Sequence, residues 1–269
     1  MIDLLPNYLF HKDGFLHQLI LLHNKFKSIP ENIFHQIPKI TKIDCSYNPL
    51  EICDMTLIGE GFRRLSRLHF LSLAGPGSPH AANCTLPATF LSPFSKVHTL
   101  DLSESFILQR NGAMLRELVN VSEIKLNKLE PYKSCPSQAA YLLKNIPASI
   151  RTLTMERWKT NQPLTEDCYL NASTLMPLRG SRLCGLSFRY SDKILGDRLT
   201  AEVFEGIPLV NLDLTYCRFL TIDYEALDEF NRLTYLSLEG NQMGPRSFKL
   251  FKTAKSGGKL NNIVLKSIG

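Results

Sequence analysis

Apolar and polar positions alternate in short stretches that recur along the whole chain. The clearest is residues 209–219, in which Leu212 and Leu214 are apolar and Asp213 between them is charged. Successive side chains of a strand point to opposite faces, so this alternation predicts a short strand with one buried and one open face. We expect Leu212 and Leu214 to face a core and Asp213 to face solvent.

Ten copies of this spacing can be aligned, separated by 24 to 33 residues. Nearly all have apolar residues at the fourth and sixth positions. The first positions of the copies are Leu16, Ile40, Leu68, Val97, Val121, Ile150, Leu183, Leu209, Leu233 and Leu260. The shared template, L-x-x-L-x-L-x-x-N/C-x-apolar, resembles the leucine-rich repeat. It implies an α/β solenoid of about ten repeats, a horseshoe with a parallel β-sheet on its concave face and irregular loops and short helices on its convex side.

The ninth template position should carry a side chain that hydrogen-bonds the backbone of the neighbouring turn, forming a ladder. The residues expected to form this ladder are Asn24, Asn48, Cys217 and Asn241, with Ser105 and Ser191 as weaker substitutes. Four copies do not fit the pattern, those with Pro76, Leu129, Trp158 and Ile268. We therefore expect less regular repeats, with less certain boundaries, between residues 74 and 182.

The segments that return from one strand to the next carry a second apolar cluster. A phenylalanine precedes the next strand in several copies, at Phe34, Phe62 and Phe204, with Phe90 and Phe230 as variants. A stacked row of these rings is expected to fill the outer half of the core.

Four of the seven cysteines lie in the longer repeats, outside the strand template. Stacking brings equivalent return segments together, so we predict disulfides between Cys53 and Cys84 and between Cys135 and Cys168. Each would close a loop of roughly 30 residues and stabilise the fold by about 3 to 4 kcal/mol in the chain-entropy picture. The other three, at Cys45, Cys184 and Cys217, are expected to be free, with Cys45 and Cys217 buried as small hydrophobic side chains.

Three N-x-S/T sequons accompany the cysteines, at Asn83, Asn120 and Asn171. Together these features indicate a secreted environment with glycans at these asparagines. The alternative is a cytosolic solenoid in which the sequons occur by chance.

The chain has a formal net charge of +6. The template places six acidic and four basic residues on the concave face, namely Asp44, Asp101, Glu123, Glu156, Asp213, Glu239, Lys42, Lys125, Arg189 and Lys266. The positive excess therefore lies on the flanks, at Arg63, Arg64, Arg67, Lys249, Lys252, Lys255 and Lys259. This rim is a candidate site for an anionic ligand, with nucleic acid as a weaker partner prediction, and a solvated rim without a ligand is the alternative.

The repeats run through residues 1–269 as a single domain. Residues 4–10 resemble the back half of a repeat, like residues 28–34, and the chain closes in mid-repeat at Gly269. No terminal cap, transmembrane segment or signalling domain is evident. We expect a fragment of a longer receptor or an incomplete gene model.

Two stretches, residues 201–214 and 233–241, together with the ladder and the phenylalanine positions, resemble a Toll-like receptor ectodomain. That resemblance implies recognition of a microbial or endogenous ligand and homo- or heterodimerisation in the full-length receptor. It also implies an extracellular or endosomal location as part of a membrane-anchored receptor. A structural or adhesive extracellular leucine-rich-repeat protein with protein partners is the alternative.

Motifs of catalysis are missing from the sequence. Residues 255–259 contain glycine and lysine but lack the order of a phosphate-binding loop, and there is no C-x-x-C, H-E-x-x-H or G-x-S-x-G. His17, His23 and His69 have no sequence companion at the spacing of a metal site or catalytic triad. We therefore expect neither an enzyme nor a bound cofactor or metal.

Overall fold

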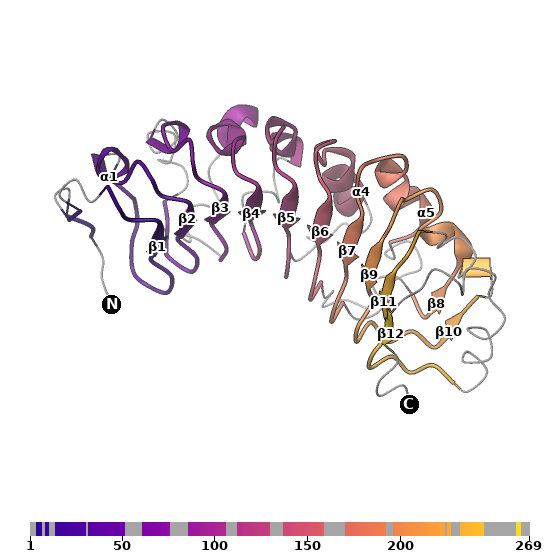
Figure 1. Cartoon of the computed structure of the whole chain (residues 1–269). Coiled ribbons are helices and arrows are strands. Elements are labelled where there is room, and N and C mark those ends of the chain that lie inside the picture. The colour runs from indigo at the N-terminus through magenta and orange to yellow at the C-terminus, as the bar shows by residue number, and fades with distance from the viewer. Residues whose placement is uncertain are drawn as a thin grey trace. The chain divides into compact units, whose positions relative to one another are not determined.

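A computed structural model describes the repeated strands and many of the segments between them (Figure 1). The described residues are 4–6, 9–10, 14–30, 32–51, 61–75, 86–105, 112–129, 137–158, 170–191, 196–223, 225–226, 232–244 and 262–264. The chain divides into two compact units, Met1–Lys125 and Leu126–Gly269.

The first unit contains five parallel strands in chain order. They are β1 (Gln18–Ile20), β2 (Lys42–Asp44), β3 (Phe70–Ser72), β4 (Thr99–Asp101) and β5 (Glu123–Lys125). Each strand pairs with the next copy along the chain, so that the neighbours in space are neighbours in sequence.

The second unit repeats this arrangement. Its main strands are β6 (Thr152–Thr154), β7 (Gly185–Ser187), β9 (Asn211–Asp213), β11 (Tyr235–Ser237) and β12 (Asn262–Val264). A separate pair of parallel strands, β8 (Arg198–Leu199) and β10 (Thr221–Ile222), lies on the return segments. An ion pair between Arg198 and Asp223 bridges the two strands at this edge.

The predicted register is confirmed in both units, because each strand of the main sheet occupies the third to fifth positions of its template copy. The fourth positions pair directly, for example Leu19 with Ile43 and Leu212 with Leu236. These leucines and isoleucines are almost fully buried except for Ile263 on β12, which is 37% exposed, whereas the flanking third and fifth positions are mostly half-exposed. The spacing holds in the middle copies too, where less regular repeats were expected.

Short helices follow the strands on the return segments. They are α1 (Asn32–Gln36), η3 (Ala88–Phe94), η4 (Gly112–Glu117), α4 (Ser137–Lys144), α5 (Ala172–Leu175), η6 (Met176–Leu178) and η7 (Ala201–Val203). Among the described residues, no helix is long and apolar enough to cross a membrane.

A row of phenylalanines packs behind the strands of the first unit. The rings of Phe34 and Phe62 lie 4.6 Å apart between centroids, and Phe62 and Phe94 lie 5.0 Å apart. The row continues through Phe94, which also contacts Phe90 at 6.4 Å, so Phe90 lies beside the row. In the second unit Phe204 contacts Phe188, and Phe230 lies outside the described residues.

Ladder side chains hold the turns that follow the strands. The Asn48 amide donates to the carbonyls of Leu21 and Cys45 at 2.9 and 3.0 Å, and its Oδ1 accepts from the Phe26 N–H at 3.1 Å. Asn241 makes the same set of bonds in the second unit, donating to Leu214 at 2.9 Å. A buried amide thus satisfies backbone groups of two successive repeats.

Three other side chains bond the equivalent carbonyl, which belongs to the sixth position of the preceding repeat. Cys217 Sγ donates to Phe188 O at 3.1 Å, and Ser191 Oγ donates to Met155 O at 3.0 Å. The Trp158 indole donates to Leu126 O at 2.6 Å. The prediction that Trp158 breaks the ladder is therefore wrong, because an indole N–H can replace an amide N–H as a donor.

Candidate functional site

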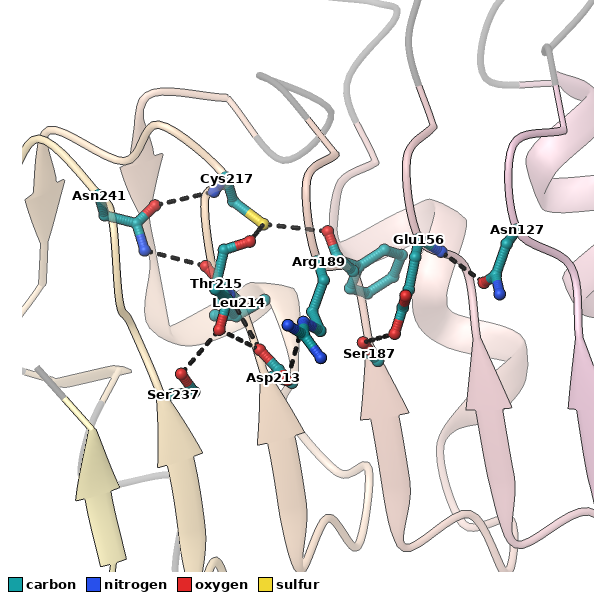
Figure 2. Close-up of polar contacts among 11 residues, drawn as sticks. Asn127, Glu156, Ser187, Arg189, Asp213, Leu214, Thr215, Cys217, Ser237 and Asn241 are labelled. Carbon is teal, nitrogen blue, oxygen red and sulfur yellow. Dashed lines mark hydrogen bonds and ion pairs between the residues drawn. The ribbon is translucent and has the colours of Figure 1, made fainter. Parts of the chain in front are cut away.

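Side chains on the open face of the second unit are joined in a polar network that crosses its strands (Figure 2). Thr215 donates to Asp213 Oδ1 through both its backbone N–H and its hydroxyl. The same hydroxyl lies 2.7 Å from the Ser237 hydroxyl on β11. These bonds hold the Asp213 carboxylate in one orientation on the surface.

Arg189 lies beside this carboxylate at the end of β7. Its Nε is 3.5 Å from Asp213 Oδ2, a separation that is longer than a hydrogen bond, and 42% of its side chain is exposed. Burial is the largest single influence and lowers the pKa of the Arg189 guanidinium, but Asp213, Glu156 and Tyr190 together raise that pKa above its ordinary value. Arg189 therefore keeps its positive charge, and part of its side chain is exposed to solvent.

Glu156 is held in place from two sides. Its carboxylate accepts a hydrogen bond from the Ser187 hydroxyl at 2.8 Å, and its backbone N–H donates to Asn127 Oδ1 at 2.9 Å. Glu156, Arg189 and Asp213 were all assigned to the open face by the template. Figure 2 shows two groups of contacts, one joining Glu156 to Ser187 and Asn127 and the other joining Arg189 to Asp213, and Glu156 acts on Arg189 through its charge.

The first unit carries a counterpart of this arrangement. Asp44 Oδ1 accepts from the backbone and hydroxyl of Ser46, and that hydroxyl lies 2.6 Å from the hydroxyl of Ser72. Next to it, the Lys42 ammonium lies 4.8 Å from the centroid of the Phe70 ring, and the Lys125 ammonium lies 5.9 Å from it. Both units therefore present charges whose positions are set by hydrogen bonds or rings.

The eighth template position adopts a left-handed backbone in nine described copies. Seven of these residues carry side chains with φ near +55°, and in the other two copies the position is glycine. The residues are His23, Tyr47, Gly75, Glu104, Lys128, Arg157, Tyr190, Tyr216 and Gly240. This conformation is unfavourable by roughly 1 to 2 kcal/mol for a residue with a Cβ. The large side chains at this position therefore lower the stability of the fold.

Two tyrosines at this position form an exposed stack in the second unit. The rings of Tyr190 and Tyr216 are nearly parallel, with centroids 5.1 Å apart, and 37% and 41% of these residues are exposed. The guanidinium groups of Arg157 and Arg189 lie 5.5 and 5.6 Å from the Tyr190 ring. We call Arg157, Arg189, Tyr190 and Tyr216 the tyrosine ridge.

Gly240, at the same template position in the following repeat, leaves room for the ring of Tyr216. A Cβ at Gly240 would clash with atoms of the Tyr216 ring, so Tyr216 lies flat over this glycine. In the first unit Tyr47 likewise covers Gly75, stacks on His23 at 4.6 Å and donates to Glu104 at 2.6 Å. The alternation of polar and apolar residues gave no sign of either stack, because ring contact between copies depends on the left-handed turn.

The residues predicted for the basic rim divide between the described and undescribed parts of the chain. Arg63, Arg64 and Arg67 are exposed, with Arg63 bonded to the Ser92 hydroxyl and Arg64 to the ring of His35. The predicted lysines lie outside the described residues, namely Lys249, Lys252, Lys255 and Lys259.

The predicted modification sites are similarly divided. Asn120 is exposed in the turn before β5, and Asn171 is exposed at the start of α5, where its Oδ1 accepts from the Thr174 N–H at 3.0 Å. Asn83 lies outside the described residues. So do the four cysteines of the predicted disulfides, Cys53, Cys84, Cys135 and Cys168. Cys45, Cys184 and Cys217 are free, and Cys45 and Cys217 are buried, as expected.

No model of a protein family matches the chain, and no curated protein does. Among solved structures, the leucine-rich repeat domain of APL1B is similar, with 18% identity over 98% of this chain and 72% of that one and a TM-score of 0.51. The fold is that of a leucine-rich-repeat protein. A chain of the Toll–Spatzle complex, a molecular hub in Drosophila development and innate immunity, is 15% identical over 99% of this chain, with a TM-score of 0.48.

This leucine-rich-repeat chain spans 39% of that chain of the Toll–Spatzle complex. At such identities the likeness to APL1B establishes the predicted α/β solenoid class and does not identify a ligand. Function has to be argued from the surfaces that the repeats build.

Proposed function

We propose that this leucine-rich-repeat chain is a protein-recognition domain that binds its partner on the second unit. The observation that carries the proposal is the exposed Tyr190–Tyr216 stack beside Arg189. Tyrosine and arginine are enriched at the energetically dominant positions of protein interfaces, where rigid rings bury area at a low cost in conformational entropy.

The open face next to the ridge supports the same proposal. Asp213 is held by Thr215 through two hydrogen bonds, and Arg189 forms an ion pair with Asp213 before a partner arrives. Binding therefore costs less side-chain entropy than it would on a surface of unrestrained charges. Fixed charges of both signs also discriminate between partners, because a mismatched charge costs free energy.

The charges of the ridge indicate the chemistry of the partner. Arg157 and Arg189 place two guanidinium groups around the Tyr190 ring, and Arg157 is exposed. Guanidinium groups pair best with carboxylates, and stacked rings accept an apolar or aromatic side chain. The partner surface proposed here combines acidic with aromatic or aliphatic residues.

The narrower proposal is the ligand-recognition part of a Toll-like innate immune receptor, at the cell surface or in an endosomal lumen. It rests on the repeat template and the phrases at residues 201–214 and 233–241, which resemble that family. Glycans at Asn120 and Asn171, the disulfides and receptor dimerisation are parts of this narrower proposal. No catalytic role is proposed.

A binding screen with a charge reversal tests the protein-recognition proposal. The chain, displayed as a multimer, is assayed against a panel of individually purified extracellular proteins, in parallel with Arg189→Glu and Arg116→Glu. Arg116 is an exposed arginine on η4 of the first unit and serves as the matched control. The proposal is supported by proteins that bind the parent chain and Arg116→Glu but do not bind Arg189→Glu. Hits that survive Arg189→Glu, or an empty panel, count against it.

A further inference from the structure

We propose that His69 and His98 form a surface site for a divalent transition metal ion such as Cu²⁺, Ni²⁺ or Zn²⁺. The two histidines are 29 residues apart in sequence and occupy the second position of neighbouring template copies. In the structure their ring centroids lie 5.0 Å apart. Both side chains are exposed, so that an ion can reach them from solvent.

The separation of the rings is that of a two-histidine chelate. A metal–nitrogen bond of about 2.0 to 2.1 Å places the ion about 3.2 Å from each ring centroid. Two such rings are about 4.5 Å apart at a right angle between the bonds and about 5.2 Å apart at the tetrahedral angle. The observed 5.0 Å lies between these limits.

The backbone fixes the two residues relative to one another. The N–H groups of His98 and Thr99 both donate to the carbonyl of His69, each at 2.9 Å. Phe70 and Thr99, which follow the two histidines, pair directly in the β3–β4 register. The two residues are therefore held side by side before an ion binds, so little backbone ordering entropy opposes binding.

The second template positions of the first unit form a row across its strands, and the row contains no lysine or arginine. Its members are His17, Thr41, His69, His98 and Ser122. Imidazole nitrogen is a preferred ligand for copper, nickel and zinc, and affinity for a given site generally peaks at Cu²⁺ in this series.

Other described histidines lack this arrangement. Thr41 separates His17 from His69 in the row, and His35 receives a hydrogen bond from Arg64, with 2.6 Å between the two nitrogens. His23 stacks on Tyr47. The proposal is thus specific to one pair.

With two protein ligands, the ion keeps open coordination positions. Water fills them in the free chain, and a histidine or carboxylate of a bound partner can replace that water. The site would then make binding of such a partner depend on the metal. This inference is independent of the tyrosine ridge, which belongs to the second unit.

The test is Cu²⁺ binding to the full chain, produced without a histidine tag and with Cys184→Ser to remove the one described thiol that is not buried. Titration calorimetry gives affinity and stoichiometry, and electron paramagnetic resonance reports nitrogen ligands. We expect one ion bound through two imidazole nitrogens. Either His69→Ala or His98→Ala should lower the affinity about tenfold or more, within the range seen when supporting groups of metal sites are removed.

His17→Ala is the matched control and should leave the affinity unchanged, because it removes an exposed histidine from the same row. Circular dichroism verifies that each variant is folded. Unchanged Cu²⁺ affinity in both His69→Ala and His98→Ala would overturn the proposal, and so would equal losses in His17→Ala.

Discussion

The indole N–H of Trp158 donates to the carbonyl of Leu126 at 2.6 Å, in the position where other repeats use an asparagine amide. Trp158 is 1% exposed, and its ring is among the largest fully buried side chains of the described residues. One residue therefore supplies both a polar and an apolar component of the repeat.

Removing the indole N–H while keeping a ring tests this role. Trp158→Phe should lower the free energy of unfolding by about 1 to 3 kcal/mol, because a buried carbonyl loses a donor and the core loses volume. Urea denaturation followed by far-UV circular dichroism suits the test, since Trp158 is the only tryptophan in the chain. Val119→Ala, at a site that is 62% exposed, should stay within about 0.5 kcal/mol of the parent. A Trp158→Phe variant as stable as the parent would contradict the ladder role.

A pair of glycine variants tests the contact beneath Tyr216. Gly240 and Gly180 have nearly the same backbone, with φ of +69° and +67°, but an added Cβ meets Tyr216 at the first site and nothing within 4 Å at the second. Gly180→Ala should cost roughly 1 kcal/mol of stability, because only the backbone is strained. Gly240→Ala should cost at least about 1 kcal/mol more, because the ring must move. Equal losses in urea denaturation would show that Tyr216 does not rest on this glycine.

The buried thiol of Cys45 predicts a dependence of stability on pH. Burial and, to a smaller extent, Asp44 raise the pKa of Cys45 above its ordinary value. The folded chain therefore keeps the proton that the unfolded chain releases, and the stabilisation is present at low pH and lost as the pH rises past the unfolded value. The slope reaches about 1.36 kcal/mol per pH unit for one group.

Comparing the parent with Cys45→Ala isolates this effect from other titrating groups. Between pH 8 and about pH 10.5, the parent should lose about 2 kcal/mol more of its unfolding free energy than the variant does. Chemical denaturation at a series of pH values provides the measurement. Parallel pH profiles for the two proteins would mean that Cys45 is ionised or reached by solvent in the folded chain.

The strand register could be predicted from the sequence because alternation of side chains is a local property. Leu212 and Leu214 must face the same side of any strand that contains them, and the same alternation occurs in each copy. The ladder was predicted less well. The template specifies asparagine or cysteine at the ninth position, whereas the turn requires only a side chain that can donate a hydrogen bond. Trp158 meets that requirement without resembling asparagine.

The candidate sites are formed by contacts between side chains of neighbouring repeats. Tyr190 and Tyr216 stack because both occupy left-handed turns of adjacent repeats, and the polarity pattern does not encode that conformation. His69 and His98 are different, because they share one template position in consecutive copies. Comparing the copies position by position would have revealed this pair, whereas the search for ligand spacing along the chain did not.

The central claim is that a protein partner binds through the tyrosine ridge, and a comparison of two tyrosines tests it most directly. Tyr216 and Tyr141 are 41% and 45% exposed, and Tyr141 lies on α4, away from the strand face. For a partner recovered from the binding screen, biolayer interferometry gives the affinity of Tyr216→Ala and Tyr141→Ala. We predict a loss of about 2 kcal/mol, or roughly 30-fold, for Tyr216→Ala and no measurable loss for Tyr141→Ala. Equal affinities for Tyr216→Ala and the parent chain would contradict the account.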